Sequence, residues 1–74
     1  MKAVVTGASS GIGRALSAEL VKRGFEVLGA ARNERALRAL RDELGQSFRY
    51  VVADLSKLEG VDRVAQAARE LGSV

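Results

Sequence analysis

The sequence lacks residue types on which many catalytic and metal sites depend. It contains no cysteine, so disulfide bonds, thiolate nucleophiles and thiolate metal ligands are excluded. It contains no histidine either, which removes the commonest general base and a common metal ligand. Any function of these 74 residues must therefore use backbone groups, hydroxyls, carboxylates, amides and cationic side chains.

Aromatic residues are also scarce, being only Phe25, Phe48 and Tyr50. The net charge of +3 is compatible with a nucleic-acid partner, but three aromatics offer no platform on which bases could stack. The cationic residues are spread over all the predicted helices, often four residues from an acid. These pairs are Glu19 with Arg23, Glu34 with Arg38, Arg38 with Asp42, and Glu59 with Arg63. The pattern is typical of solvated helix faces and disfavours a nucleic-acid interface.

Long hydrophobic runs are absent. No stretch approaches the ~20 apolar residues that span a membrane. The opening residues, MKAVVTGASSG, contain no apolar run long enough for a secretory signal. We therefore expect a cytoplasmic protein with no membrane partner.

Three apolar runs predict buried strands, at residues 2–6 (KAVVT), 25–31 (FEVLGAA) and 48–54 (FRYVVAD). Helical periodicity follows each run. The first predicted helix carries Ile12, Leu16 and Leu20 and is followed by Gly24. The second begins at Asn33, carries Leu37, Leu40 and Leu44, and stops at Gly45. The third starts after Ser56 and stops at Gly72, and its apolar residues are Val61, Val64, Ala65, Ala68 and Leu71.

This βαβαβα order predicts an α/β fold with right-handed crossovers and a parallel three-stranded sheet. In a doubly wound half the strands take the order 3-2-1 with helices on both faces, giving three layers. One edge of the first strand is then left without a neighbour. Such an edge is prone to pairing, so we expect either marginal stability or a homodimer formed through it.

The stretch TGASSGIGRA, residues 6–15, places three glycines between a strand and a helix. Backbone N–H groups converge at such a turn, and the helix dipole favours an anion there. Gly7 suits the tight turn, Gly11 a close approach to phosphate, and Gly13 close packing of helix on strand. The sequence therefore predicts a phosphate-binding turn.

Two common phosphate-binding patterns do not fit this stretch. The Walker A pattern fails because Arg14 and Ala15 follow Gly13, and G-x-G-x-x-G fails because Leu16 stands at the third glycine. The observed T-G-x-x-x-G-x-G, directly after the first strand, resembles the nucleotide-binding turn of the short-chain dehydrogenase/reductase family. That resemblance implies a Rossmann-type domain and a bound dinucleotide cofactor.

The ends of the second and third strands refine this expectation. No carboxylate stands at the end of the second strand to bond a ribose 2′-hydroxyl; Arg32 stands there instead and suits a 2′-phosphate, with Ser9 or Ser10 as added donors. We therefore expect NADP(H) to be preferred over NAD(H). Arg35 is a second candidate for the phosphate, and Asn33 is interpreted as a helix cap.

The resemblance also implies a role for the end of the third strand. Asp54 would accept from the adenine amino group and Leu55 would pack at the adenine edge, although Asp54 or Ser56 could instead cap the next helix. The complete set of predicted cofactor-binding residues is Gly7, Ser9, Ser10, Gly11, Ile12, Gly13, Arg32, Asp54 and Leu55.

Hydride transfer in this family uses a serine and a Tyr-x-x-x-Lys pair. Tyr50 is followed four residues later by Asp54 and lies within a predicted strand, so we interpret it as sheet packing and predict no catalytic residue. The resemblance covers the whole chain but only about the first third of a family member. We expect residues 1–74 to be one partial Rossmann domain, truncated before the fourth strand and inactive alone. The alternative is a non-catalytic interaction or regulatory module, or a designed half-fold, that self-associates through its free edge.

Overall fold

The computed structural model describes residues 1–72 and contains the predicted alternation of strands and helices. The strands are β1 (Lys2–Thr6), β2 (Glu26–Ala31) and β3 (Phe48–Val52), and the helices are α1 (Gly11–Lys22), α2 (Glu34–Leu44) and α3 (Leu58–Leu71). A short 3-10 helix, η1 (Gly45–Ser47), joins α2 to β3. The predicted fold class is confirmed.

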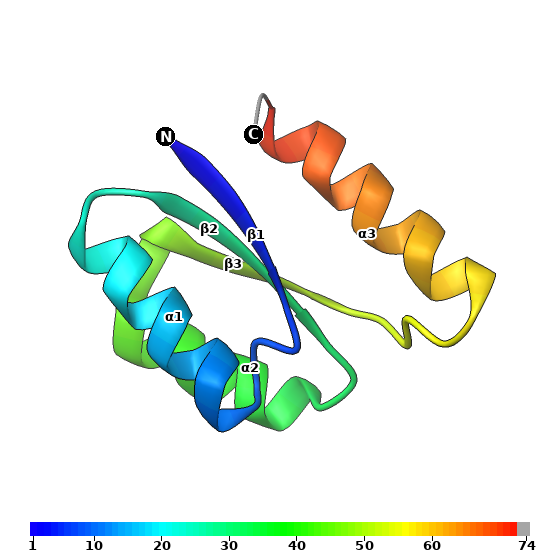
Figure 1. Ribbon diagram of the computed structural model, residues 1–74, viewed down its shortest axis with the longest axis horizontal. Coiled ribbons are helices and arrows are strands. Elements are labelled where there is room, and N and C mark those ends of the chain that lie inside the picture. The colour runs from blue at the N-terminus through cyan, green and yellow to red at the C-terminus, as the bar shows by residue number, and fades with distance from the viewer. Residues whose placement is uncertain (73–74) are drawn as a thin grey trace.

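The strands form one parallel sheet in the order β1-β2-β3, which is the predicted order. Val5 of β1 is level with Gly29 of β2, and Gly29 is level with Tyr50 of β3. Helices α1 and α2 cover one face, and α3 covers the other (Figure 1). Because the strands are parallel, their carboxyl ends meet along one edge of the sheet.

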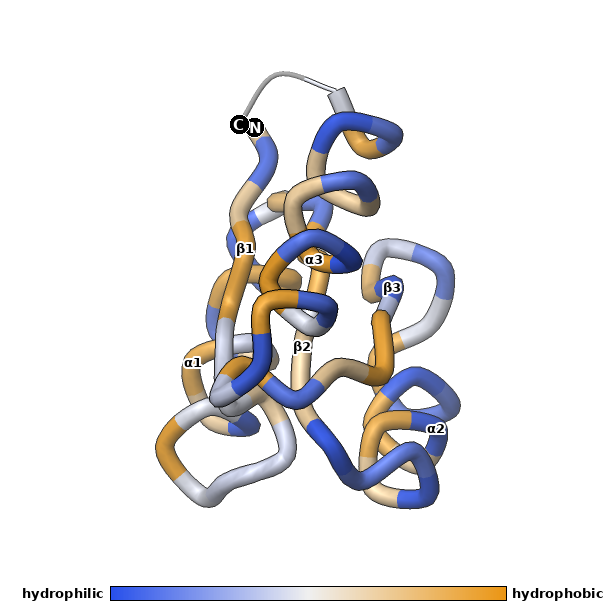
Figure 2. Tube along the Cα trace, turned by 90° about the vertical axis from the view of Figure 1, so that its right-hand side faces the viewer, coloured by the Kyte–Doolittle hydropathy of each residue, from blue (hydrophilic) through white to orange (hydrophobic). Residues whose placement is uncertain are grey.

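Most of the core lies between the sheet and the helices α1 and α2. Its buried members are Val5, Ala8, Val27, Ala31, Leu37, Leu40 and Phe48. Leu28 and Ala30 alternate with these residues along β2 and are buried beneath α3. The tube in Figure 2 shows the resulting pattern, in which α2 and α3 alternate between hydrophobic and hydrophilic residues.

The helix ends follow from local chemistry. Ser10 caps α1 by accepting a hydrogen bond from the Gly13 N–H at 3.1 Å, and Asn33 caps α2 by accepting from the Ala36 N–H at 3.1 Å. Gly45 ends α2 with a φ of +83°. Within residues 1–72, no helix combines the length and the apolar character needed to cross a membrane.

The structure differs from the sequence-based expectation at two strand ends and one helix start. The second strand begins at Glu26 rather than Phe25, and α3 begins at Leu58. The third strand ends at Val52 rather than Asp54, although the Ala53 N–H still donates to the Ala31 carbonyl of β2's last residue at 2.9 Å.

The apolar side predicted for α1 is only partly buried. Ile12 is 85% exposed and Leu16 is 48% exposed, whereas Gly13 and Ser17 face the sheet and are buried. The helix starts so close to β1 that only small side chains fit beneath its first two turns. The periodicity therefore misplaces Ile12 and Leu16, whereas Leu20, the third residue of the predicted side, packs against the core.

Two of the four expected helical ion pairs form among the described residues. Arg23 bonds Glu19 at 2.8 Å and Arg38 bonds Glu34 at 3.3 Å, whereas Arg38 with Asp42 and Glu59 with Arg63 are not within ion-pair distance. A bond that the sequence did not predict joins α1 to α2, from Arg14 to Glu43 at 3.3 Å. All three pairs are exposed and contribute little stability.

Buried Ser17 generates a prediction about stability. Its hydroxyl is fully buried beneath α1 and has no hydrogen-bond partner among the described residues. Since an unsatisfied buried hydroxyl is costly, Ser17→Ala should raise the free energy of unfolding by about 1–2 kcal/mol, measured by urea denaturation.

The control is Ala39→Ser, at an exposed position within α2. It measures the helix-propensity difference between the two residue types, which is about 0.5 kcal/mol. A gain from Ser17→Ala no larger than the loss from Ala39→Ser would contradict the proposed cost of the buried hydroxyl.

Candidate functional site

The turn after β1 is fixed by bonds to a single carbonyl. Gly7 has a φ of +66°, a conformation that suits glycine. Its carbonyl accepts from the Ser10 N–H at 3.0 Å and from the Ser10 hydroxyl at 2.7 Å. The Ala8 N–H donates to the Ala30 carbonyl at 3.2 Å, which attaches the turn to β2. The turn is therefore held in one shape before any ligand binds.

The first turn of α1 keeps two backbone donors free. The Gly13 N–H is satisfied by the Ser10 side chain, and the Arg14 N–H donates to the Ser10 carbonyl at 2.8 Å. The N–H groups of Gly11 and Ile12 have no acceptor within residues 1–72. Together with the positive end of the helix dipole, these two donors can bind an anion.

Gly13 lets α1 approach the end of β1. A Cβ at this position would stand 2.8 Å from the Ala8 Cα and would overlap the Gly7 carbonyl oxygen. Only glycine permits this contact, which agrees with the role that the sequence predicts for Gly13, close packing of the helix on the strand. Gly11 has open space around it, which leaves its N–H accessible.

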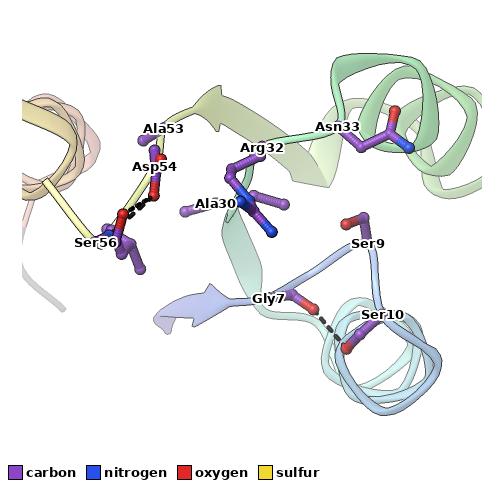
Figure 3. A pocket seen from close by; sticks show the side chains of 11 residues that line it. Gly7, Ser9, Ser10, Ala30, Arg32, Asn33, Ala53, Asp54 and Ser56 are labelled. Atoms are coloured by element: carbon purple, nitrogen blue, oxygen red, sulfur yellow. Dashed lines mark hydrogen bonds between the residues drawn. The ribbon is translucent and has the colours of Figure 1, made fainter.

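An open cavity of about 720 Å³ lies along the carboxyl ends of the three strands (Figure 3). Its lining residues are Gly7, Ser9, Ser10, Ala30, Ala31, Arg32, Asn33, Ala53, Asp54, Leu55 and Ser56. Six of the predicted site residues therefore share one cavity. The other three, Gly11, Ile12 and Gly13, lie on the first turn of α1, next to Ser10 and outside the lining.

Arg32 supplies the positive charge of this cavity. It follows β2 directly, is exposed, and projects into the space between Gly7 and the Asp54–Ser56 pair (Figure 3). No carboxylate of the described residues lies within ion-pair distance of its guanidinium. Arg35, the alternative cation, does not line the cavity.

Asp54 is held by Ser56. One carboxylate oxygen, Oδ1, accepts from the Ser56 N–H at 3.0 Å and from the Ser56 hydroxyl at 2.6 Å. These two bonds lower the pKa of Asp54, and the positive charges of Arg32 and Lys57 lower it further. Neither Asp54 nor Ser56 caps α3, whose first turn has no side-chain cap, so the capping alternative is wrong.

Several lining residues were not predicted as part of the site. Ala30, Ala31 and Ala53 form an apolar wall of the cavity. The sequence feature that could have identified them is their small side chains at the ends of strands. Gly60 was also missed, because a glycine inside a helix carries no motif. It brings α3 against the backbone of Asp54, where a Cβ would stand 2.9 Å from the Asp54 nitrogen.

Tyr50 lies outside the cavity. It is half-buried in the middle of β3 and packs against the core, as the sequence predicts. The Tyr50 hydroxyl lies beside Arg38 and, together with Glu34, raises the pKa of that guanidinium. Its surroundings are those of a structural residue.

Comparison with known proteins identifies relatives along the whole chain. Residues 1–74 match the family described as short chain dehydrogenase. Sepiapterin reductase from Xenopus laevis is 47% identical over 76 residues, covering 92% of this chain and 29% of the relative. NADPH-dependent pterin aldehyde reductase from Arabidopsis thaliana is 41% identical over 69 residues, covering 90% of this chain and 28% of the relative.

A solved structure shares the fold as well. It is 3-ketoacyl-(acyl-carrier-protein) reductase from Brucella melitensis complexed with NADH, with a TM-score of 0.92 and 32% identity. The match covers 99% of this chain and 30% of that protein. The chain thus spans less than a third of the length of each of these three proteins.

The Asp54–Ser56 pair generates a prediction about protonation. Ser56→Ala removes the hydroxyl bond, the largest cause of the lowered pKa, so the pKa of Asp54 should rise toward its ordinary value of 3.8. Carboxyl ¹³C chemical shifts followed through an acid titration measure it directly. Ser9→Ala is the control, because Ser9 lines the same cavity and makes no bond to Asp54.

The same pair sets the sign of a stability effect. A carboxylate whose pKa is lower in the folded state contributes stability above its unfolded pKa and loses it as the pH falls through the folded pKa. Ser56→Ala should therefore weaken the dependence of unfolding free energy on pH in the range below about pH 4. An unchanged Asp54 titration in Ser56→Ala would contradict the assignment.

Proposed function

Since the chain belongs to the short-chain dehydrogenase family, we propose that its cavity holds the adenosine diphosphate half of a nicotinamide dinucleotide, with NADP(H) preferred over NAD(H). The observation that carries this proposal is the position of Arg32 in the cavity at the end of β2. Its guanidinium has no ion-pair partner within residues 1–72, and no carboxylate stands at this strand end. Relatives in this family bind nicotinamide dinucleotides.

The diphosphate is assigned to the first turn of α1. The N–H groups of Gly11 and Ile12 are free to donate, and the helix dipole adds to their attraction for negative charge. Gly11 has no neighbour that would block a phosphate oxygen from reaching the backbone. The role of Ile12 is assigned to its N–H, since its side chain does not line the cavity.

The 2′-phosphate is assigned to Arg32 and Ser9. A guanidinium offers a planar fork of donors that matches a phosphate. Ser9 lines the cavity and makes no side-chain hydrogen bond with any described residue, so its hydroxyl can donate to the ligand. Ser10 is the weaker candidate, because its hydroxyl already donates to Gly7 and accepts from Gly13.

The adenine is assigned to Asp54 and Leu55. Ser56 occupies Oδ1 of Asp54, which leaves Oδ2 to accept from an adenine amino group. Leu55 is 40% exposed and lines the same cavity, so its side chain can cover an edge of the base. The lowered pKa of Asp54 keeps this acceptor ionised through the neutral range.

The activity proposed for the protein is oxidation or reduction of an alcohol or carbonyl group with NAD(P)(H). The bound dinucleotide would supply or accept the hydride. Residues 1–74 are proposed to form one partial domain whose part is to bind and orient the cofactor. No catalytic role is assigned to any of them, and the family's serine and Tyr-x-x-x-Lys are proposed to lie outside this segment.

A second candidate function is an interaction module that pairs through β1. The observation that favours it is that β1 has a strand neighbour on one side only within residues 1–72. This role is compatible with cofactor binding, because the edge of β1 does not line the cavity.

The test of cofactor preference is Arg32→Ala, followed by isothermal titration calorimetry with NADP⁺ and NAD⁺. A charge-assisted bond is worth about 1.5–3 kcal/mol, so affinity for NADP⁺ should fall about 10- to 100-fold. Affinity for NAD⁺ should change by less than about threefold, because NAD⁺ has no 2′-phosphate for Arg32 to bind.

The matched control is Arg35→Ala, which removes an exposed arginine three residues further along and outside the cavity. Arg32→Lys separates the charge from the fork geometry and should restore only part of the preference. Equal affinities of the unmodified chain for the two cofactors would refute the NADP(H) preference. An equal effect of Arg35→Ala would place the phosphate elsewhere.

A further inference from the structure

Helix α3 begins directly against the loop that carries Asp54. The loop covers residues 53–57, and α3 starts at Leu58. Gly60, the third residue of this helix, is buried. A Cβ at Gly60 would overlap the Asp54 carbonyl oxygen and would stand 2.5 Å from the Asp54 carbonyl carbon and 2.9 Å from its nitrogen. The first turn of α3 therefore lies on the backbone of Asp54.

This contact is made with backbone atoms, which cannot turn aside as the end of a side chain can. Two hydrogen bonds join the same groups. The Lys57 N–H donates to the Asp54 carbonyl at 3.1 Å, and the Gly60 N–H donates to the Lys57 carbonyl at 3.1 Å. Ser56 holds the other part of Asp54, its carboxylate (Figure 3). The helix thus fixes the backbone of Asp54, and Ser56 fixes its side chain.

Helix α1 makes the same kind of contact with the glycine turn. Gly13 is also the third residue of its helix, and a Cβ there would overlap the Gly7 carbonyl oxygen. Both glycines lie beneath a group that the cavity offers to a ligand, the N–H donors of α1 in one case and the Asp54 carboxylate in the other. Glycine is a poor helix former, so helix propensity does not account for Gly60. Its close packing does.

We propose that Gly60 is a positioning residue for the adenine: it lets α3 hold Asp54 where Oδ2 can accept from the adenine amino group. This role rests on the proposed contact between Asp54 and the adenine. Gly60 does not line the cavity, so it can influence the ligand only through the loop that it supports.

A small displacement of this loop is enough to change which base is bound. A hydrogen bond needs its heavy atoms about 2.7–3.2 Å apart and is largely lost when the acceptor moves by ~1 Å. Any side chain at position 60 must move Asp54 away from α3, because its Cβ and the Asp54 carbonyl cannot occupy the same space. Substitution of Gly60 should therefore remove the preference for a base that carries an amino group.

Isothermal titration calorimetry of Gly60→Ala tests the proposal with two ligands. They are NADP⁺ and nicotinamide hypoxanthine dinucleotide phosphate, whose base has a carbonyl in place of the amino group. The unmodified chain should bind NADP⁺ at least about tenfold more tightly, and Gly60→Ala should reduce this ratio to less than about threefold. A purely structural loss would weaken both ligands equally. An unchanged ratio therefore overturns the proposal.

The matched control is Ala65→Gly, which exchanges the same two residue types at an exposed position of the same helix. It lowers helix propensity and should leave the ratio of affinities unchanged. Propensity alone would make Gly60→Ala raise the urea midpoint of unfolding, whereas the overlap with Asp54 should make it fall. A raised midpoint would show that α3 accommodates the Cβ and would contradict the proposed contact.

A second measurement needs neither a ligand nor a change at Gly60, and it remains decisive if Gly60→Ala does not fold. In Ser56→Ala the backbone of Asp54 should stay rigid, with an amide order parameter near about 0.85, because α3 still holds it. A value below about 0.6 would assign that constraint to Ser56 and overturn the proposal. Equal binding of the two dinucleotides by the unmodified chain would instead refute the adenine assignment, and with it the cofactor role of Gly60.

Discussion

The structure depends on the close approach of α1 to the end of β1. The Ser10 hydroxyl bridges two backbone groups, donating to the Gly7 carbonyl and accepting from the Gly13 N–H. Gly13 then fits where any side chain would overlap Gly7. This contact fixes the position of the helix N-terminus relative to the sheet, and with it the direction in which the free N–H groups of Gly11 and Ile12 point.

The parallel sheet turns this local arrangement into a site. One part of the candidate site follows each strand at its carboxyl end: the glycine turn after β1, Arg32 after β2 and Asp54 after β3. The small residues Ala30, Ala31 and Ala53 leave room between them. The cavity thus has the glycine turn at one end, the Asp54 carboxylate at the other and the Arg32 guanidinium between them. The proposed positions of diphosphate, adenine and 2′-phosphate follow this order.

Much of this arrangement is predictable from the sequence, because the alternation of strands and helices along the chain, the glycine spacing and the helix caps are local signals. Asn33 and Gly45 limit α2 as their chemistry dictates, and the T-G-x-x-x-G-x-G spacing places the turn. The burial of Ser17 in place of Leu16, and the packing of Gly60 on Asp54, depend on how closely two elements approach. Such distances are tertiary properties, and no periodicity encodes them. Cofactor preference, compartment and assembly stay predictions.

The exposure of Ile12 and Leu16 has the same cause as the binding turn. With Gly13 close against β1, Ile12 and Leu16 in the first turns of α1 stay exposed, whereas Leu20 and Val21 further along the helix pack against the core. Within residues 1–72, β1 has a strand neighbour on one side only. The close approach of α1 to β1 thus positions the Gly11 and Ile12 N–H groups and, within residues 1–72, also leaves the side chains of Ile12 and Leu16 exposed.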